Sequence, residues 1–331
     1  MGRGIKDFRE AGEYVQEEMW VKQQLPLIRG DWFYVDPYAG SNNRDGRTIS
    51  TGLADILAAY NKCTSGRGDG ICILSGGTTS THTTSALTAV LDWTKYAITV
   101  FGVAAGGIKS RARIVASTAS DLAYLIDVQG QNNRFYNIHV CNEGDAAGAL
   151  GCLKVSGNRN LFVNSHFVGA GHVTPGAVAL AAGGSLGAHD LNLNASENEF
   201  FGCTFGDNSV IRAGNNANIV LVAQQSKNSF KDCRTIKTST TAGTGAIGLH
   251  VANTLNGWVT FDNCLFTCWY SNEYTTANTS LLIGAESTNE GLLMHNCGMV
   301  GWAEWDDAAS SKMFMTNGAG AALGGVGIAA G

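Results

Sequence analysis

The sequence predicts an all-β protein, a right-handed parallel β-helix (a single-stranded solenoid) over residues 31–305, on three observations. A segment of the form Phe-x-Asn/Asp/Gly-x-x-apolar recurs along the chain at intervals that vary from 27 to 38 residues. Gly is frequent, at 43 of 331 residues, and charged residues make up only 15%, a composition that favours turns over solvated helices. Helical repeats keep a tight period, whereas a β-solenoid tolerates loops of different lengths between stacked strands.

Residues 1–30 are interpreted as an N-terminal helical arm or anchor. Apolar residues spaced among charged ones over residues 5–24 predict an amphipathic helix, with Ile5, Phe8, Val15 and Met19 on its apolar side. Such a helix can cap the end of a solenoid or dock on a partner. The sequence supports the capping role and the docking role equally.

Residues 31–77 read as a cap at the start of the solenoid. Trp32–Val35 is a predicted strand, and a turn-rich loop follows it. A helix capped by Ser50 or Thr51 is then expected up to Lys62. Its apolar stripe would comprise Leu53, Ile56, Leu57 and Tyr60. The buried strand Ile71–Leu74 closes the cap, and the helix would cover strand edges that otherwise invite aggregation.

Six repeated segments define columns along the solenoid. They begin at Phe135, Phe162, Phe200, Phe230, Phe261 and Met294. The first residue should face inward and the second outward, and the third should occupy a tight bend where Asn, Gly or Asp tolerates left-handed backbone angles. The bend resets the alternation, so the fourth and sixth residues point inward.

Two structural ladders follow from this alignment. Asn137, Asn164, Asn263 and Asn296 should stack at the bend about 4.8 Å apart per coil. Cys203, Cys233, Cys264 and Cys297 should form one inward column of small buried side chains. Thiols that advance one coil at a time cannot converge tetrahedrally on a zinc ion, so we expect no metal and no other cofactor.

The remaining cysteines and the C-terminal segment are less informative. Reduced thiols are expected in a large domain without an export signal, although Cys63 and Cys72 flank a Gly-rich turn and their oxidation is left open. Residues 306–331 are assigned to a short Gly/Ala-rich tail.

The candidate catalytic residues are carboxylates, because many β-helices are polysaccharide lyases or glycosidases that use them. The candidates, all expected to face outward, are Asp262 with Lys231 one coil apart, and the loop acids Asp190, Glu197 and Glu199. The outward column reads Tyr136, Val163, Phe201, Lys231, Asp262 and His295, which is half apolar with a single acid. Solvated or interface side chains are therefore favoured over a catalytic pair, with the apolar stripe covered by residues 169–187 or by another subunit.

Other motifs favour ordinary structural roles. His139 and His166 should stack as surface imidazoles, and the tripeptide Arg-Gly-Asp at residues 29–31 and 67–69 is best explained by turns. A net charge of −5 with scattered Lys and Arg does not indicate nucleic-acid binding. Neither a signal peptide nor a membrane span is expected.

The order of several motifs resembles pectin-lyase-like β-helix proteins that tailed bacteriophages carry as virion components. The motifs are Phe33-Tyr34-Val35-Asp36-Pro37 with Gly40-Ser41 and Asp45-Gly46-Arg47, Leu91-Asp92-Trp93-Thr94-Lys95, Val100-Phe101-Gly102, Arg111-Ala112-Arg113-Ile114, the Phe-x-Asn-Cys-x-Phe coils and Gly301-Trp302-Ala303-Glu304-Trp305-Asp306. The likeness covers nearly the whole chain.

The resemblance implies a phage virion structural protein, assembled in the host cytoplasm as a homotrimer. A capsid-surface decoration or head-fibre subunit without catalytic activity, contacting the capsid or another virion protein, is the favoured role. The alternative is a tail-associated spike or fibre that binds or cleaves host surface polysaccharide, with Glu197, Glu199 and Asp262 as the candidate acids.

Overall fold

The computed structural model describes most of the chain. The described residues are 26–74, 87–103, 112–178, 186–212, 216–222, 225–239, 247–252, 255–270, 281–285, 291–302, 304–306 and 313–315. The predicted helix over residues 5–24, with Ile5, Phe8, Val15 and Met19, lies outside them. Within them, no helix is long and apolar enough to cross a membrane.

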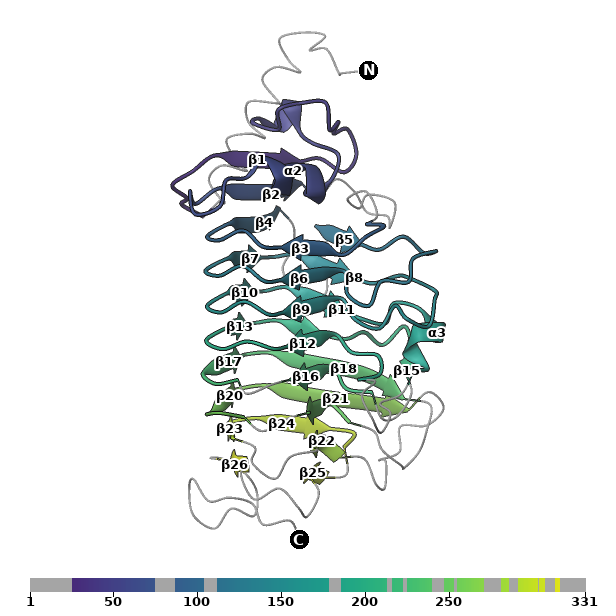
Figure 1. The fold of residues 1–331 in the computed structure, drawn as a ribbon. Coiled ribbons are helices and arrows are strands. Elements are labelled where there is room, and N and C mark those ends of the chain that lie inside the picture. The colour runs from purple at the N-terminus through teal and green to yellow at the C-terminus, as the bar shows by residue number, and fades with distance from the viewer. Residues whose placement is uncertain are drawn as a thin grey trace, which may run out of the picture.

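The chain winds into an elongated parallel solenoid with three sheets along its length (Figure 1). Sheet 1 has ten strands in the order β1 (Trp32–Val35), β2 (Gly70–Leu74), β4 (Thr99–Val103), β7 (Arg134–Tyr136), β10 (Leu161–Val163), β13 (Glu199–Phe201), β17 (Asn228–Lys231), β20 (Val259–Asp262), β23 (Leu292–His295) and β26 (Met313–Met315). The predicted parallel β-helix is thus confirmed, and sheet 1 takes its last strand from the segment that the sequence assigned to the tail.

Sheets 2 and 3 complete each coil. Sheet 2 contains β5 (Arg113–Val115), β8 (His139–Cys141), β11 (His166–Val168), β14 (Thr204–Phe205), β18 (Arg234–Ser239), β21 (Leu265–Tyr270) and β24 (Gly298–Val300), with β15 (Ile211–Arg212) paired to β18. Sheet 3 contains β3 (Leu91–Trp93), β6 (Ile126–Val128), β9 (Leu153–Val155), β12 (Leu191–Leu193), β16 (Ile219–Leu221), β19 (Leu249–Val251), β22 (Leu281–Ala285) and β25 (Glu304–Asp306). Each coil passes from sheet 1 through a tight bend to sheet 2, through a longer loop to sheet 3, and through a corner back to sheet 1.

The N-terminal cap differs from its prediction in the start of its helix. A 3-10 turn (Ile49–Thr51) capped by Thr48 comes first, and helix α2 (Ile56–Lys62) begins only after Asp55, whose carboxylate accepts from the Ala58 N–H at 2.7 Å. Asp55 and Thr48, rather than Ser50 or Thr51, are therefore the caps.

Helix α2 covers the N-terminal end of the core, where the Tyr60 and Trp93 ring centroids lie 4.5 Å apart. Leu53, Ile56 and Tyr60 are buried, but Leu57 is 44% exposed. The predicted apolar stripe is therefore one residue narrower than expected.

The interior holds a continuous stack of aromatic rings, as the repeat predicted. Phe135, Phe162, Phe200, Phe230 and Phe261 pair in register, and successive ring centroids are 4.6–4.9 Å apart with nearly parallel planes. Stacked rings of this kind add a specific contribution to the burial of a large apolar area. The stack is the main apolar axis of the solenoid.

The tight bend after sheet 1 also follows the prediction. The third residue of all six segments has a left-handed backbone, with φ between 47° and 63° at Asn137, Asn164, Gly202, Asp232, Asn263 and Asn296. Asn296 donates to Asn263 at 3.1 Å, and Asn263 donates to Asp232 at 2.6 Å. The bend ladder is therefore hydrogen-bonded across these last coils.

A second asparagine ladder, which the repeat alignment did not predict, lies at the corner before sheet 1. Asn133, Asn160, Asn198 and Asn228 are at most 1% exposed. Each side-chain oxygen accepts a backbone N–H from the preceding coil at 2.8–2.9 Å, from Ile98, Asn133, Asn160 and Asn198 in turn. Hydrogen bonds of this kind make a buried amide oxygen tolerable, and the four of them connect the corners of five successive coils.

Candidate functional site

The outer face of sheet 1 carries the predicted outward column. Tyr136 and Val163 are half-buried, Phe201 is 42% exposed, and Lys231, Asp262 and His295 reach solvent in the next coils. The column is therefore apolar towards the N-terminal end and charged towards the C-terminal end.

Asp262 is the centre of the charged part of this column. Its carboxylate contacts His295 Nδ1 at 2.6 Å on one neighbouring coil and Lys231 Nζ at 3.9 Å on the other. The Asp232–Asn263–Asn296 ladder runs beside it. Asp262 therefore connects three coils through its contacts with His295 and Lys231.

Glu197 belongs to the corner, not to the sheet face. It adopts a φ of 62°, and its carboxylate lies 2.5 Å from Arg159 Nε and 3.6 Å from Lys227 Nζ. The hydrogen bond from Arg159 holds the pKa of Glu197 below its usual value. Arg159 and Lys227 occupy the same corner position one coil away on either side, with φ values of 60° and 58°, so the three residues form a charged ladder at the surface.

Glu199 is exposed on strand β13 and is distant from Asp262. The register aligns Glu199 with Ser229 and then Thr260, so Asp262 lies two coils and two residues away. Strand spacing and rise place them about 12 Å apart. Retaining glycosidases need about 5 Å between carboxylates and inverting ones at most about 9.5 Å, so this pair matches neither arrangement.

Asp190, expected to face outward, is instead fully buried in a charged cluster. Its carboxylate accepts from Arg212 at 2.8 Å, from Asn218 at 2.8 Å and from the Gly169 N–H at 2.8 Å. Arg212 also donates to the Ala188 carbonyl at 2.7 Å. The cluster fixes the loops around helix α3 (Val173–Gly176) and β15 to the side of the solenoid, where Figure 1 places them.

Lys237 lies beside this cluster and is also fully buried. Its ammonium group donates to the carbonyl oxygens of Asn216 and Ile247. Burial lowers the pKa of Lys237 to about 7, with a further contribution from Arg212. The sequence pattern did not predict the burial of Asp190, Arg212 and Lys237, because the loops that cover them come from different coils.

His139 and His166 stack as predicted, but they are not at the surface. Their ring centroids are 4.5 Å apart and the side chains are 6% and 1% exposed. His166 Nε2 contacts the Gly206 carbonyl oxygen at 2.8 Å, and burial lowers its pKa. Neither ring belongs to the hydrophobic core, which holds the next residues, Val140 and Phe167. The Gly206 carbonyl, in the loop that follows β14, covers His166.

Acid pH should destabilise the fold through His189. Burial lowers the pKa of His189 from 6.5 to about 4, so between those values the unfolded chain binds a proton that the folded one does not. This histidine therefore removes about 3 kcal/mol of unfolding free energy as the pH falls from 6.5 to 4, and nothing more below that. Denaturant titrations should show a flatter pH dependence for His189→Asn, which retains a donor for the Gly187 carbonyl. An unchanged slope in His189→Asn would refute this attribution.

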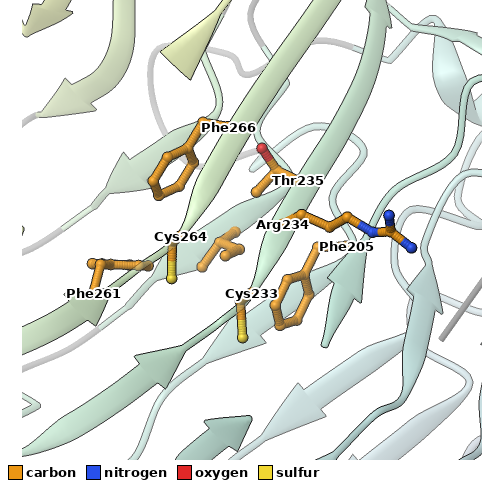
Figure 2. Close-up of a pocket in the computed structure, with 8 residues that line it drawn as sticks. Phe205, Cys233, Arg234, Thr235, Phe261, Cys264 and Phe266 are labelled. Carbon is orange, nitrogen blue, oxygen red and sulfur yellow. The ribbon is translucent and has the colours of Figure 1, made fainter. Parts of the chain in front are cut away.

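The predicted cysteine column lies in the interior. Figure 2 shows the thiols of Cys233 and Cys264 among the rings of Phe205, Phe261 and Phe266, with the Arg234 side chain extending away from them. The space among these residues is too small for a water molecule. Cys203, Cys233 and Cys264 are buried and Cys297 is partly buried. Burial raises the pKa of Cys233, and the hydrogen bond with Cys233 raises that of Cys264 to about 12, so the column suits packing rather than thiolate chemistry.

The pairing of Cys63 with Cys72 does not occur. Both thiols are free and buried. Cys63 packs in the main core, whereas Cys72 packs with Tyr34 and Ile49 in a separate cluster. Among the described residues, no group of three His, Cys, Asp or Glu is placed to hold a metal ion.

The two Arg-Gly-Asp tripeptides lie side by side on adjacent coils. The Gly30 N–H donates to the Gly68 carbonyl at 2.9 Å, and the Asp31 N–H donates to the Asp69 carboxylate at 2.9 Å. Asp69 is fully buried and Gly68 has a φ of 79°. The second tripeptide is thus a turn whose acid is unavailable to a partner.

Comparison with known proteins places the fold but not the activity. No family model and no curated protein matches the chain. Pectin methylesterase PemA from Erwinia chrysanthemi is 13% identical, with a TM-score of 0.56 over 90% of this chain and 92% of that one. Pectate lyase Pel9A is 15% identical, with a TM-score of 0.55 over 82% of this chain, which spans only 63% of the lyase. Pectin methylesterase from carrot is 13% identical, with a TM-score of 0.54 over 91% of this chain and 87% of that one.

At such identities the likeness concerns architecture alone. Taken with the three parallel sheets and the inward Phe column, it shows that the chain folds as a right-handed parallel β-helix of the pectate lyase and pectin methylesterase type.

Proposed function

We propose that this protein is a structural subunit of a tailed-phage virion, a capsid-surface decoration or head fibre that acts without catalysis as a homotrimer. The observation that carries the proposal is the use of the candidate acids: Glu197 and Asp262 each connect three coils through cations or imidazole. Carboxylates held in this way reinforce a rigid rod. The order of motifs along the chain, which resembles phage virion β-helices, supports the location.

The location is tested by particle assembly. We expect a chain without residues 1–24 to keep the circular dichroism and thermal transition of the solenoid but to be absent from purified particles. Quantitative mass spectrometry of particles grown with full-length or truncated protein measures this. Normal incorporation of the truncated chain would contradict anchoring through the N-terminal segment.

A second candidate function is binding of a host surface polysaccharide along sheet 1, which the fold permits. Its specific support is the outward column, in which the Tyr136 and Phe201 rings stand two coils, about 10 Å, apart and the polar residues follow them. Rings on such a face can pack against sugar rings, and the Lys231–Asp262–His295 group can bind hydroxyls.

Incubation with capsular or lipopolysaccharide glycans separates the two functions. New reducing ends or unsaturated sugars that disappear in Asp262→Asn would establish cleavage. Retention on immobilised glycan that is lost in Phe201→Ala, without any product, would establish binding. Neither result is expected for a purely structural subunit.

A further inference from the structure

An open cavity of about 360 Å³ lies at the N-terminal end of sheet 1, away from the acids discussed above. Its lining includes Arg29, Gly68, Thr99 and Arg134, with Leu27 at the rim. These residues precede or begin strands β1, β2, β4 and β7, so the cavity extends over four adjacent strands of sheet 1, about 14 Å along the solenoid. Its volume falls within the roughly 300–1,000 Å³ of small-molecule sites.

The charge around this cavity is positive, although the chain as a whole is negative. The two nearby acids are already paired: Asp31 contacts Arg47 and Arg67 at 3.0 Å, and Asp69 contacts Arg67 at 2.6 Å. Among the described residues, neither Arg29 nor Arg134 forms an ion pair with an acid. Within the part of the chain that the structure describes, the surroundings of the cavity therefore hold two guanidinium groups without a neutralising acid.

The backbone around the cavity is held in place from within the solenoid. Gly68, Ala97 and Asn132 occupy left-handed corners with φ values of 79°, 56° and 57°. Directly after Asn132, the buried Asn133 side chain accepts the Ile98 N–H at 2.9 Å, and the Arg134 N–H donates to the Ile98 carbonyl at 2.9 Å. The strand start that carries Arg134 is thus fixed before any ligand arrives, which lowers the entropic cost of binding.

We propose that this cavity binds an oxyanion, a carboxylate or a phosphate, carried by a ligand of about the size of one or two sugar rings. Guanidinium groups recognise both anions through paired, charge-assisted hydrogen bonds. The Thr99 hydroxyl, on a side chain that is 5% exposed, adds a hydrogen-bonding group to the lining. Leu27, which is 98% exposed, offers an apolar surface to the uncharged part of the ligand. The site is independent of the structural role proposed above, and Arg134 begins strand β7, which also carries Tyr136 of the sheet 1 polysaccharide face.

The test is calorimetric titration of the full-length protein with four probes: glucuronate, glucose 6-phosphate, inorganic phosphate and neutral glucose. Saturable binding of at least one anionic probe is expected, with glucose at least about tenfold weaker because it lacks the charge-assisted hydrogen bonds. Preference for glucuronate identifies a carboxylate ligand, and preference for either phosphate probe identifies a phosphorylated one.

Side-chain substitutions locate the binding. Arg29→Gln and Arg134→Gln should each weaken the bound anion at least about tenfold, and the double variant should abolish binding. Lys227→Gln removes the same charge from a corner three coils beyond Asn132, at a side chain that is 75% exposed, and should bind like the wild type. Both arginines are exposed, so thermal unfolding should confirm that every variant folds.

Two results would overturn the proposal. One is the absence of saturable binding by all three anionic probes. The other is an affinity that falls equally in Lys227→Gln and in the arginine variants, which would reduce the effect to overall charge.

Discussion

Phe200→Ala should lower the free energy of unfolding by about 3–5 kcal/mol, the range for truncation of a buried aromatic ring. Phe200 is 1% exposed, and its ring stacks on Phe162 and Phe230 with centroids 4.7 Å away on each side. Phe205 adds an edge contact at 5.8 Å. Truncation leaves a cavity between coils that stacked backbones cannot close, because strand spacing is fixed by the hydrogen bonds of three sheets. Reversible urea denaturation followed by circular dichroism measures the loss.

The adjacent residue supplies a matched control. Phe201 sits on the same strand but points outward and is 42% exposed, so Phe201→Ala should cost less than about 1 kcal/mol. Equal losses of unfolding free energy in Phe200→Ala and Phe201→Ala would mean that the buried ring stack stabilises the fold no more than an exposed phenylalanine does. That result would contradict the stabilising role of the stack.

Asn160→Leu should cost about 3 kcal/mol or more, although it replaces a polar side chain by an apolar one of similar size. Its side-chain oxygen accepts the Asn133 N–H at 2.9 Å, and its amide donates to the carbonyls of Gly130 at 3.1 Å and Gly157 at 3.0 Å. Leucine leaves these three backbone groups without their partner in the interior, at about 1–3 kcal/mol each. The same denaturant titration measures the change.

Asn164→Gly tests whether the loss of stability expected for Asn160→Leu comes from the buried ladder or from the removal of any asparagine. Asn164 lies at the exposed bend with a φ of 47°, and Gly202 already occupies the equivalent position in the next coil. Glycine accepts that backbone, so a loss of at most about 1 kcal/mol is expected. A loss as large as that of Asn160→Leu would show that the two ladders are not distinguished by burial.

The repeat could be predicted from the sequence because it depends on local geometry. Alternation along a strand and its reset at a left-handed bend place Phe162 and Cys203 inside and Asn164 at the turn without knowledge of distant residues. The start of helix α2 was harder to place. Ser50 and Thr51 look like good caps, yet they belong to a short 3-10 turn that Asp55 follows.

The buried corner ladder had a signal that was overlooked. Asn133, Asn160, Asn198 and Asn228 each stand two residues before an anchor phenylalanine. An asparagine beside a turn is ordinarily solvated, so only the stacking of coils reveals that its side chain enters the interior.

The burial of outward residues could not be predicted from a local pattern. The outward direction of His139 and His166 is correct, but whether an outward residue meets water depends on loops from other coils. Asp190 is the extreme case, because Arg212, which neutralises it, stands 22 positions further along the chain. Such loops vary in length and have no repeated sequence pattern, so their paths cannot be predicted from the periodicity of the sequence.

The left-handed corners at Arg159, Glu197 and Lys227 have an implication for how this surface can change. Their unusual backbone is maintained by the asparagine that follows each of them, which is buried, while their own side chains point into solvent. The buried asparagine therefore stabilises the corner conformation, and the exposed residue before it determines the chemistry of the surface. A lineage can replace these charged side chains, at the cost of the ion pairs that Glu197 forms with Arg159 and Lys227, while the buried asparagines keep the coil beneath. The solenoid can thus present new contact surfaces while its interior stays the same.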